Sequence, residues 1–374
     1  MDKRVVLAGV GAIGRATIQQ AIVDGSIKSG RFPLSVLVDP AYVTANDQRP
    51  DPERLILHLT NCPQNPGLRR ELQERITLNP AFSSRDEILL DGRSVPLIVR
   101  KKPSDYAYDL KDALVYDATG LAADNEAFTR AYLEAGAAKV FITALANHAD
   151  ATMVYGLNHR QVSIDARVIS PLSCTTNAIT FPLKVIHEKW GIVYGLVVTM
   201  LAYENYQQSP DGTYDDPRRG RHDAILNASI SHAATAVGMV IPDLSGRLGG
   251  FSMRGRWPAG SVALLFLLTE SKLETPELHA ALREAAATKF DGRMAVNECK
   301  DYVLADVIGD SHASVVDIAT HINSENNEGF TKIFDLLGAA RRGKPVVVSV
   351  YYDNGWGTAR SYLLGAQHII ETMK

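Results

Sequence analysis

One cysteine stands among hydroxyl residues in the stretch ISPLSCTTNAITFPL, residues 169–183. Cys174 follows Ser173, precedes Thr175, and lies where a helical pattern begins. The first turn of a helix offers open N–H groups and the positive end of the helix dipole, which lower the pKa of a thiol. The same N–H groups can stabilise an oxyanion on a carbonyl that the sulfur attacks. Because an ordinary thiol is only a few per cent thiolate at neutral pH, this placement indicates a nucleophile.

The other two cysteines, Cys62 and Cys299, stand at unrelated spacings from Cys174. Three such cysteines form neither a disulfide framework nor a set of metal ligands, and they indicate a reducing compartment. A buried structural thiol is the alternative interpretation of Cys174, since free cysteines are commonly buried. Its polar neighbours favour the nucleophile.

A second chemical pattern is the glycine-rich stretch AGVGAIGRA, residues 8–16, between an apolar run and a helical pattern. In this setting one glycine makes the tight turn, one admits a pyrophosphate to the backbone, and one lets helix and strand pack closely. Asp39 ends the next apolar run, where a carboxylate accepts the ribose hydroxyls and repels a 2′-phosphate, which favours NAD over NADP. The predicted cofactor-binding residues in this stretch are Gly9, Gly11, Ala12, Ile13, Gly14 and Asp39.

Helices and strands must hold these residues in place. The pattern of apolar residues differs between the part of the chain before Cys174 and the part after it. The first half alternates buried strands with helical segments, which predicts a Rossmann-type parallel sheet in an α/β fold. After Cys174, longer strands predict an α+β domain with a mixed sheet, and the chain ends in a helix. Residues 45–87 are polar and Pro-rich and predict an irregular insertion. The predicted strands are 4–10, 34–40, 113–119, 138–145, 191–206, 261–271 and 344–353, and the predicted helices include 12–25, 125–137 and 357–374.

Length and composition limit the classes of function. The 374 residues, 46% hydrophobic, suffice for two domains with real cores. A net charge of −3 and a pI near 6.4 give no electrostatic basis for binding nucleic acid or an anionic membrane. The short basic run PRRGRH, residues 217–222, is typical of a loop or a small anion site. Without a leader-like N-terminus or a run near 18 apolar residues, we expect a cytoplasmic protein.

The SCTTN motif together with the glycine fingerprint resembles the phosphorylating glyceraldehyde-3-phosphate dehydrogenases. Four further motifs fall in the matching order over almost the whole chain: DATG (117–120), GLNH (156–159), TAVGMVIPDLSGRLGGFSMR (235–254) and YYDNGWG (351–357). The resemblance implies a homotetramer, with an NAD-binding domain over 1–173 and a catalytic domain over 174–345. It also implies that residues 346–374, a strand end and a helix, pack back on the NAD domain.

The resemblance assigns roles to single residues. Thr119 and Gly120 correspond to the strand end that contacts the nucleotide, and Asn354 to the residue that holds the nicotinamide carboxamide. Arg254 corresponds to the arginine that binds the substrate phosphate. The family chemistry implies attack of the thiolate on an aldehyde, hydride transfer to NAD, and cleavage of a thioester by phosphate or water. Hydroxyl positions around the phosphate sites correspond to Ser173, Thr175 and Ser231.

The sequence also departs from the family. The strand that carries the family's catalytic histidine reads GLVVTMLAYENYQ here, residues 195–207, with Leu201 at that position. Two phosphate-binding threonines correspond to Glu204 and Tyr206, and a carboxylate there repels a phosphate. A glycine of the family corresponds to His232.

Three hypotheses follow. In the first, His232 or Glu204 acts as the base, and water releases the product. In the second, the enzyme makes an acyl phosphate, and the helix terminus and the oxidised nicotinamide alone support the thiolate. In the third, the chain is a weakly catalytic NAD-binding relative that works through partners. We expect the first, with a small polar, anionic aldehyde as substrate; its predicted binding residues beyond the hydroxyl positions are Arg254, Arg221 and Tyr206.

Overall fold

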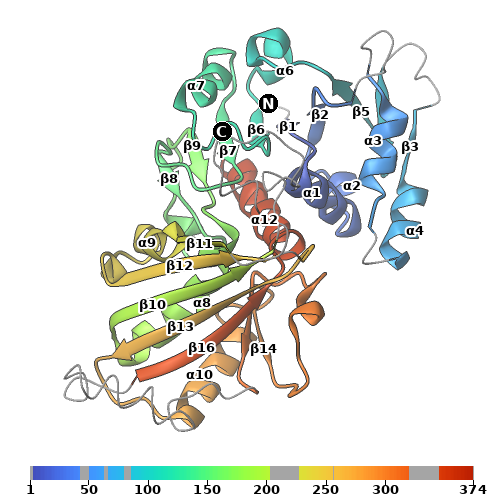
Figure 1. Cartoon of the computed structure of the whole chain (residues 1–374). Coiled ribbons are helices and arrows are strands. Elements are labelled where there is room, and N and C mark those ends of the chain that lie inside the picture. Colours follow the sequence, from blue (N-terminus) through green and yellow to red (C-terminus); the bar gives the residue numbers. More distant parts are fainter. Residues whose placement is uncertain are drawn as a thin grey trace. The chain divides into compact units, whose positions relative to one another are not determined.

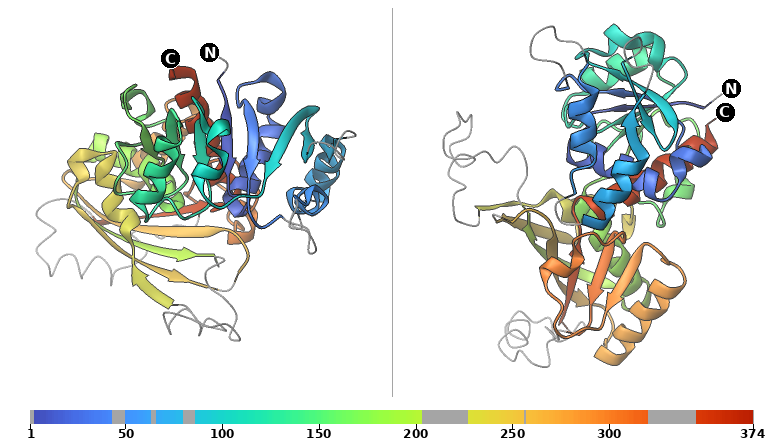
Figure 2. Two further views of the ribbon diagram at one scale, coloured as in Figure 1. Left: turned by 90° about the horizontal axis from the view of Figure 1, so that it is seen from above. Right: turned by 90° about the vertical axis from the view of Figure 1, so that its right-hand side faces the viewer.

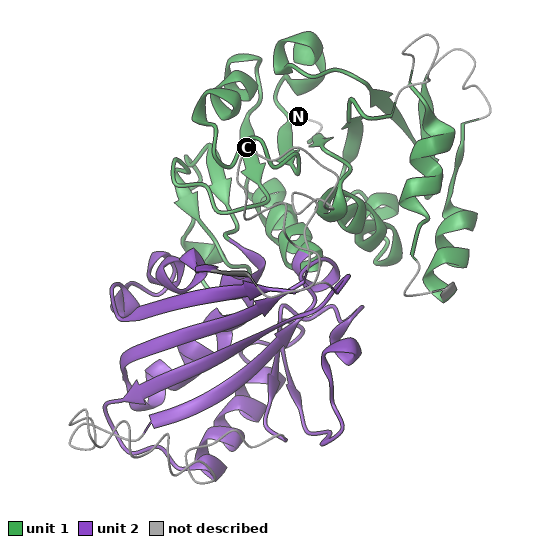
Figure 3. Ribbon diagram, in the orientation of Figure 1, with its two compact units in different colours: residues 1–172, 359–374 green, residues 173–358 purple. Residues whose placement is uncertain are grey.

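The computed structural model describes residues 3–42, 50–62, 66–79, 86–202, 227–255, 257–319 and 345–373. The chain divides into two compact units, residues 1–172 with 359–374, and residues 173–358 (Figures 1 and 3). The expected C-terminal segment, 346–374, therefore divides: its strand belongs to the second unit and only its helix to the first.

Within the described residues, the first unit contains a nine-stranded sheet in the order β3-β4-β5-β2-β1-β6-β7-β9-β8. All strand pairs from β5 to β8 are parallel, while β3 and β4 add antiparallel strands at one edge. This confirms the Rossmann-type parallel sheet. The strands are β1 (Val5–Ala8), β2 (Leu34–Val38), β3 (Ile76–Leu78), β4 (Glu87–Leu90), β5 (Arg93–Ile98), β6 (Leu114–Asp117), β7 (Lys139–Ile142), β8 (Ala151–Thr152) and β9 (Val168–Ser170).

Both faces of this sheet are covered, which explains why its central strands are mostly apolar. On β1, Val5 and Leu7 belong to one hydrophobic core, and Val6 and Ala8 to another. Such division follows from the alternation of side chains along a strand. The helices of this unit are α1 (Ala12–Val23), α2 (Ser26–Ser29), α3 (Pro52–Leu59), α4 (Pro66–Arg75), α6 (Ala107–Leu110), α7 (Glu126–Glu134) and α12 (Trp356–Thr372), the last beginning in the second unit.

The expectation of an irregular insertion over 45–87 is wrong where the structure describes it, because α3, α4 and β3 lie there. Helix α3 has a capped start: the Asp51 side chain accepts a hydrogen bond from the N–H of Arg54, and Pro52 occupies the first turn. Leu55 and Leu59, one helical turn apart, are both buried. The helix is amphipathic over too few residues for the periodicity to stand out.

The C-terminal helix packs in the first unit, as predicted from the resemblance. Leu363 and Ile370 of α12 lie in the same core as Val5 and Leu7. The Tyr362 hydroxyl donates a hydrogen bond to the carbonyl of Leu172 at 2.7 Å. The two ends of the chain consequently lie close together in every view (Figures 1 and 2).

Within the described residues, the second unit contains a seven-stranded mixed sheet in the order β11-β12-β10-β13-β16-β15-β14. The pairs β10–β12 and β14–β15 are parallel, and the others are antiparallel. The α+β domain with a mixed sheet is thus confirmed. The strands are β10 (Ile192–Leu201), β11 (Asn227–Ile230), β12 (Leu248–Arg254), β13 (Ser261–Thr269), β14 (Met294–Asn297), β15 (Ser314–Asp317) and β16 (Pro345–Tyr352).

Two long helices of this unit, α8 (Cys174–Trp190) and α10 (Thr275–Ala287), lie on one face of the sheet (Figure 1). A third, α9 (His232–Ala236), is a single turn beside β12. The opposite face carries side chains on β10, β11 and β12 that are apolar and, among the described residues, exposed: Tyr194, Leu196, Ile230 and Phe251. Among the described residues, none of the helices is long and apolar enough to span a membrane.

Candidate functional site

The glycine turn between β1 and α1 has the backbone of a phosphate-binding loop. Gly9 has a φ of +88°, and a Cβ atom there would lie 2.6 Å from the backbone of Ala118. A Cβ atom on Gly14 would lie 2.0 Å from the Gly9 carbonyl oxygen, so helix and strand can approach only with glycine at that position. At Gly11, by contrast, a Cβ atom would meet nothing within 4 Å. Of the three glycines, Gly11 is therefore the one that faces open space, where a ligand can approach the backbone.

The N-terminus of α1 is open to an anion. Gly11 occupies the N-cap position without a side chain to cap the helix, and the first turn of this described helix contains no acidic residue. Its first N–H groups and its dipole therefore favour a phosphate. Asp39 follows β2 nearby, and its carboxylate accepts hydrogen bonds from the N–H groups of Val10 (2.7 Å) and Ala41 (2.8 Å).

These residues line one pocket of about 420 Å³ in the first unit. The pocket brings together Gly9, Gly11, Asp39 and Thr119 of the predicted cofactor-binding residues. Gly120, directly after Thr119, has a φ of +75° and continues the turn after β6. The rest of the lining includes residues that the sequence argument missed, namely Arg100, Lys101, Tyr106, Phe128 and Tyr132.

The buried carboxyl group of Asp117 holds residues of the pocket lining in place. The Asp117 side chain accepts hydrogen bonds from the Tyr132 hydroxyl (2.8 Å) and the Thr119 hydroxyl (3.0 Å). Burial raises the pKa of Asp117 to about 6, and these hydrogen bonds oppose that rise. Asp117 consequently fixes Thr119, whose hydroxyl in turn accepts the N–H of Leu121 at 3.0 Å.

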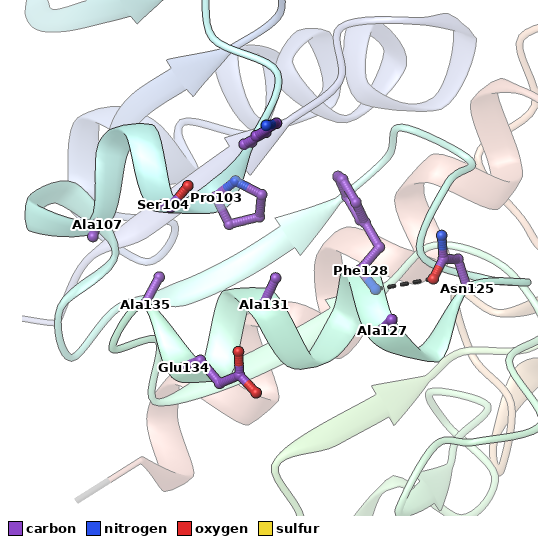
Figure 4. Close-up of a pocket in the computed structure, with 10 residues that line it drawn as sticks. Pro103, Ser104, Ala107, Asn125, Ala127, Phe128, Ala131, Glu134 and Ala135 are labelled. Carbon is purple, nitrogen blue, oxygen red and sulfur yellow. Dashed lines mark hydrogen bonds between the residues drawn. The ribbon is translucent and has the colours of Figure 1, made fainter.

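A second groove of about 580 Å³, also lined by Phe128, lies between the 3₁₀ turn Pro103–Tyr106 and α7 (Figure 4). Half of its ten lining residues are alanine or proline. The Asn125 side chain there accepts the N–H of Phe128 at 3.0 Å and caps α7. The side-chain oxygen of Asn125 therefore serves the fold.

In the second unit, Cys174 is the first residue of the 17-residue helix α8, as predicted. The Ser173 hydroxyl caps this helix by accepting the N–H of Thr176 at 3.1 Å, and it also pairs with the Thr176 hydroxyl at 2.8 Å. Cys174 itself is partly exposed. The thiol therefore lies at the positive end of a long, capped helix and is accessible to a reactant.

Tyr352, which the sequence argument missed, lies beside this helix end. It is fully buried at the end of β16, and its hydroxyl lies 2.7 Å from the Thr175 hydroxyl. Burial and the nearby Cys174 raise the pKa of Tyr352 well above its ordinary value, while hydrogen bonds to Thr175 and Ser261 oppose this. Tyr352 is consequently a neutral phenol at physiological pH. The alternation of side chains on a strand that ends in YYDN was the signal that could have indicated it.

Leu201, at the position expected for the family's histidine, is buried at the end of β10. Its partner across the sheet is Arg254, the last residue of β12. The Arg254 guanidinium donates a hydrogen bond to the Ala202 carbonyl at 3.3 Å and lowers the pKa of Tyr352. The predicted phosphate-binding arginine therefore lies in the same neighbourhood as Tyr352.

Helix α9 also contacts the cysteine helix. The Thr176 hydroxyl donates to the Ala233 carbonyl at 3.4 Å, and Ser231 is buried just before α9. His232 begins α9 with an exposed side chain. Packing does not fix an exposed imidazole, and the role of His232 as a base stays a prediction. Glu204, Tyr206 and Arg221 lie outside the described residues.

Asn354 follows β16 in a loop organised by a buried carboxylate. Asp353 accepts the N–H groups of Gly309 (2.8 Å), Gly355 and Trp356 (both 2.7 Å). The side-chain oxygen of Asn354 accepts the N–H of Gly260 at 3.0 Å. Because a backbone N–H only donates, this bond fixes the amide orientation and leaves the NH₂ group as the end that can donate to a carboxamide oxygen.

Comparison with known proteins places these two units in one family. A family model described as the C-terminal domain of glyceraldehyde 3-phosphate dehydrogenase matches residues 173–335. A glyceraldehyde-3-phosphate dehydrogenase of Borreliella burgdorferi is 33% identical over 302 residues, which are 78% of this chain and 85% of that protein. The enzyme of that name from Claviceps purpurea is 31% identical over 367 residues, 97% of this chain and 96% of its own.

A third relative, from Mycobacterium tuberculosis, is 34% identical over 276 residues, 73% of this chain and 76% of that protein, and has the same name. Both the fold and the glycine turn agree with that relationship. The pocket beside Gly11 and Asp39 fits a dinucleotide, since it offers an open helix terminus for the pyrophosphate and a carboxylate for the ribose. The chain therefore belongs to the glyceraldehyde-3-phosphate dehydrogenase family of NAD-dependent oxidoreductases.

Proposed function

We propose that this protein oxidises a small anionic aldehyde, with Cys174 as the nucleophile, and releases the product as an acyl phosphate. The main support for this proposal is the position of Cys174, which is partly exposed at the capped N-terminus of α8. The names of the relatives favour release by phosphate over the hydrolysis expected from the sequence.

The chemistry assigned to the chain is covalent. The Cys174 thiolate attacks the aldehyde carbon and forms a hemithioacetal, whose oxygen faces the N–H groups of the first turn of α8. NAD held in the pocket beside Gly11 and Asp39 would supply the acceptor for the hydride of this carbon, and loss of the proton from the hemithioacetal hydroxyl would then give a thioester. An oxygen of inorganic phosphate then attacks the thioester carbon, and the C–S bond breaks to regenerate the thiolate. His232 and Glu204 stay candidates for the proton acceptor.

We assign substrate binding to Arg254, whose guanidinium lies near Tyr352 at the end of β12. Its charge suits a phosphate or carboxylate on the aldehyde. Asn354 is assigned to the nicotinamide carboxamide, because its NH₂ group is the donor left after the bond to Gly260. The remaining proposed contacts to the anionic groups are Ser173, Thr175, Ser231, Tyr206 and Arg221.

Leu201 favours a second candidate, hydrolytic release of the product. A leucine can neither take a proton nor stabilise a thiolate, so the site departs from the arrangement that the resemblance implies. Phosphate contacts are also altered there if Glu204 and Tyr206 replace threonines. In this second candidate, water rather than phosphate attacks the thioester.

One assay separates these functions. NADH production is measured with glyceraldehyde 3-phosphate and a panel of small anionic aldehydes, each with and without inorganic phosphate. Strict dependence on phosphate supports the acyl phosphate, and NADH without phosphate selects hydrolysis. NAD binding without NADH from any aldehyde would contradict both and favour a binding protein that works through partners.

The Leu201→His variant tests whether the histidine position limits activity. If the missing imidazole is the main obstacle, the variant oxidises glyceraldehyde 3-phosphate faster than the wild type. Leu201→Gln, which is polar but not basic, is the matched control. Equal rates in all three proteins would show that other parts of the pocket exclude this substrate.

We further propose that the protein assembles as a homotetramer, using the sheet face of the second unit that lies opposite α8 and α10. Tyr194, Leu196, Ile230 and Phe251 are between 38% and 78% exposed on adjacent strands, and contiguous apolar surface of this kind marks interfaces. Light scattering after gel filtration should give four times the chain mass. Leu196→Glu should reduce that mass, whereas Tyr108→Glu, on an exposed tyrosine of the first unit, should not.

A further inference from the structure

A row of hydrogen-bonding groups leads from the strand that lacks the family's histidine to the reactive sulfur. The N–H of Ala202, next to Leu201, donates to the Ser261 hydroxyl at 3.3 Å. The Ser261 hydroxyl is near enough to the Tyr352 hydroxyl to lower the pKa of that group, and the Tyr352 hydroxyl lies 2.7 Å from that of Thr175. The Thr175 hydroxyl lies 4.0 Å from the Cys174 sulfur, the outer limit for a hydrogen bond to sulfur.

The first link is compatible with a direction of this row that ends at Cys174. A backbone N–H only donates, so Ser261 accepts from Ala202 and has its own proton available for Tyr352. Tyr352 can then donate to Thr175, and Thr175 to the sulfur. When each hydroxyl accepts one hydrogen bond and donates one, the protons of Ser261, Tyr352 and Thr175 all point toward Cys174.

Burial strengthens these bonds. Ser261, Tyr352 and Thr175 are at most 4% exposed, so water does not compete for them. In such surroundings hydrogen bonds polarise one another, and a bond to a charged group is the strongest of the set. The row therefore stabilises a thiolate more than a neutral thiol.

We propose that Tyr352 is a positioning residue that acts through Thr175 to direct a hydroxyl proton at Cys174, which lowers the pKa of the thiol. The row supplies the thiolate stabilisation for which the sequence offers no histidine at residue 201. A donor of this kind holds the thiolate but does not take up a proton, so Tyr352 is not the base. This inference rests on the proposed role of Cys174 as nucleophile.

Arg254, His232 and the helix dipole also bear on the end of α8. Arg254 on β12 acts on Tyr352 electrostatically, and the helix dipole acts on the thiol directly. His232 begins α9, which packs on α8, but its side chain is exposed. Removing the Tyr352 hydroxyl leaves all three in place, so it isolates the contribution of the row.

The test measures the rate at which iodoacetamide alkylates Cys174 in the full-length protein between pH 5 and 10. A Cys299→Ser background removes the exposed cysteine, and peptide mass spectrometry assigns the label to Cys174 rather than Cys62. Tyr352→Phe keeps the ring and removes the hydroxyl. We expect the midpoint of its pH profile to rise by about one unit, a tenfold loss of thiolate at a fixed lower pH.

Matched variants complete the test. Tyr351→Phe removes a hydroxyl one residue earlier on β16 and should leave the midpoint unchanged. Thr175→Val should raise it as Tyr352→Phe does, while Thr175→Ser, which keeps the hydroxyl, should hold it near the wild-type value. If Tyr352→Phe does not fold by circular dichroism, the Thr175 pair decides the question.

An unchanged midpoint in Tyr352→Phe or Thr175→Val would overturn the proposal. Because alkylation needs neither NAD nor aldehyde, the outcome is independent of the proposed function. A raised midpoint in a protein that oxidises no aldehyde would contradict the proposed function and support the row. Phosphate-dependent NADH production together with an unchanged midpoint would support the proposed function and contradict the row.

Discussion

Helices α1 and α8 both begin at a site where chemistry is expected, and their first turns are built in opposite ways. Helix α1 follows Gly11, which leaves the N-terminus without a side-chain cap. Helix α8 follows Ser173, whose hydroxyl caps it by accepting the N–H of Thr176. An open terminus leaves its N–H groups for an anionic ligand, whereas a capped terminus holds one side chain rigidly in the same dipole. One helix end thus suits binding and the other suits a fixed nucleophile.

The largest loss of activity should come from a substitution at the capped N-terminus of α8. Cys174→Ser should lower the rate of NADH production by at least about 10³-fold, because a serine hydroxyl is a much weaker nucleophile than a thiolate. Calorimetric titration with NAD should show unchanged affinity. Cys299→Ser, at the exposed cysteine, is the control and should keep the wild-type rate.

At the open end, two glycines should respond differently. Gly11→Ala adds a methyl group where nothing lies within 4 Å, so the melting temperature should hold while the Kd for NAD rises about a hundredfold, or 2.7 kcal/mol. Gly14→Ala places a Cβ atom 2.0 Å from the Gly9 oxygen and should lower the melting temperature as well. Equal melting temperatures in the two variants would contradict this division of roles.

Asp117 should make the first unit sensitive to pH. Its pKa in the folded chain is about 6, above the value of 3.8 expected when unfolded, so the folded state binds the extra proton. The associated stability is complete below pH 3.8 and is lost as pH rises through 6. A shift of this size corresponds to about 2–3 kcal/mol.

Asp117→Asn cannot ionise and should flatten that decline, as measured by urea unfolding at pH 4, 5, 6 and 7. Asp165→Asn, at an exposed position of the same unit, should leave the slope unchanged. The same decline in both variants would show that another group causes it.

The smallest effect concerns the cap of α8. Ser173→Ala removes the bond to the N–H of Thr176 and should lower the free energy of unfolding by about 1 kcal/mol. Ser173→Asp supplies another capping oxygen and should restore most of that loss. If Ser173→Ala were as stable as the wild type, the cap would contribute nothing to holding Cys174.

The same contrast explains what the sequence could predict. The nucleotide end is a local pattern: the glycines lie within six residues of one another, and their spacing alone indicates a strand, a turn and a helix. Cys174 was found in the same way, by its place before a helix. The parallel sheet, the mixed sheet and the returning helix followed from periodicity and from the resemblance.

The surroundings of Cys174 could not be predicted from a local sequence pattern, because they come from strands far apart in the chain. Tyr352 is 177 residues from Thr175, and the register of β13 and β16 decides which side chains face α8. Asp117 was missed for a related reason, since its role depends on Tyr132 across the strand end. Helices α3 and α4 were missed because short amphipathic segments rich in charge resemble loops.

The central claim is that Cys174 forms the covalent intermediate, and intact-protein mass spectrometry tests it most directly. The protein is mixed with glyceraldehyde 3-phosphate and NAD without inorganic phosphate, quenched in acid, and digested to locate the label. The account predicts an acyl group on Cys174 that appears with NADH and disappears when phosphate is added. NADH formed while Cys174 stays unmodified, or formed as fast by Cys174→Ser, would contradict it.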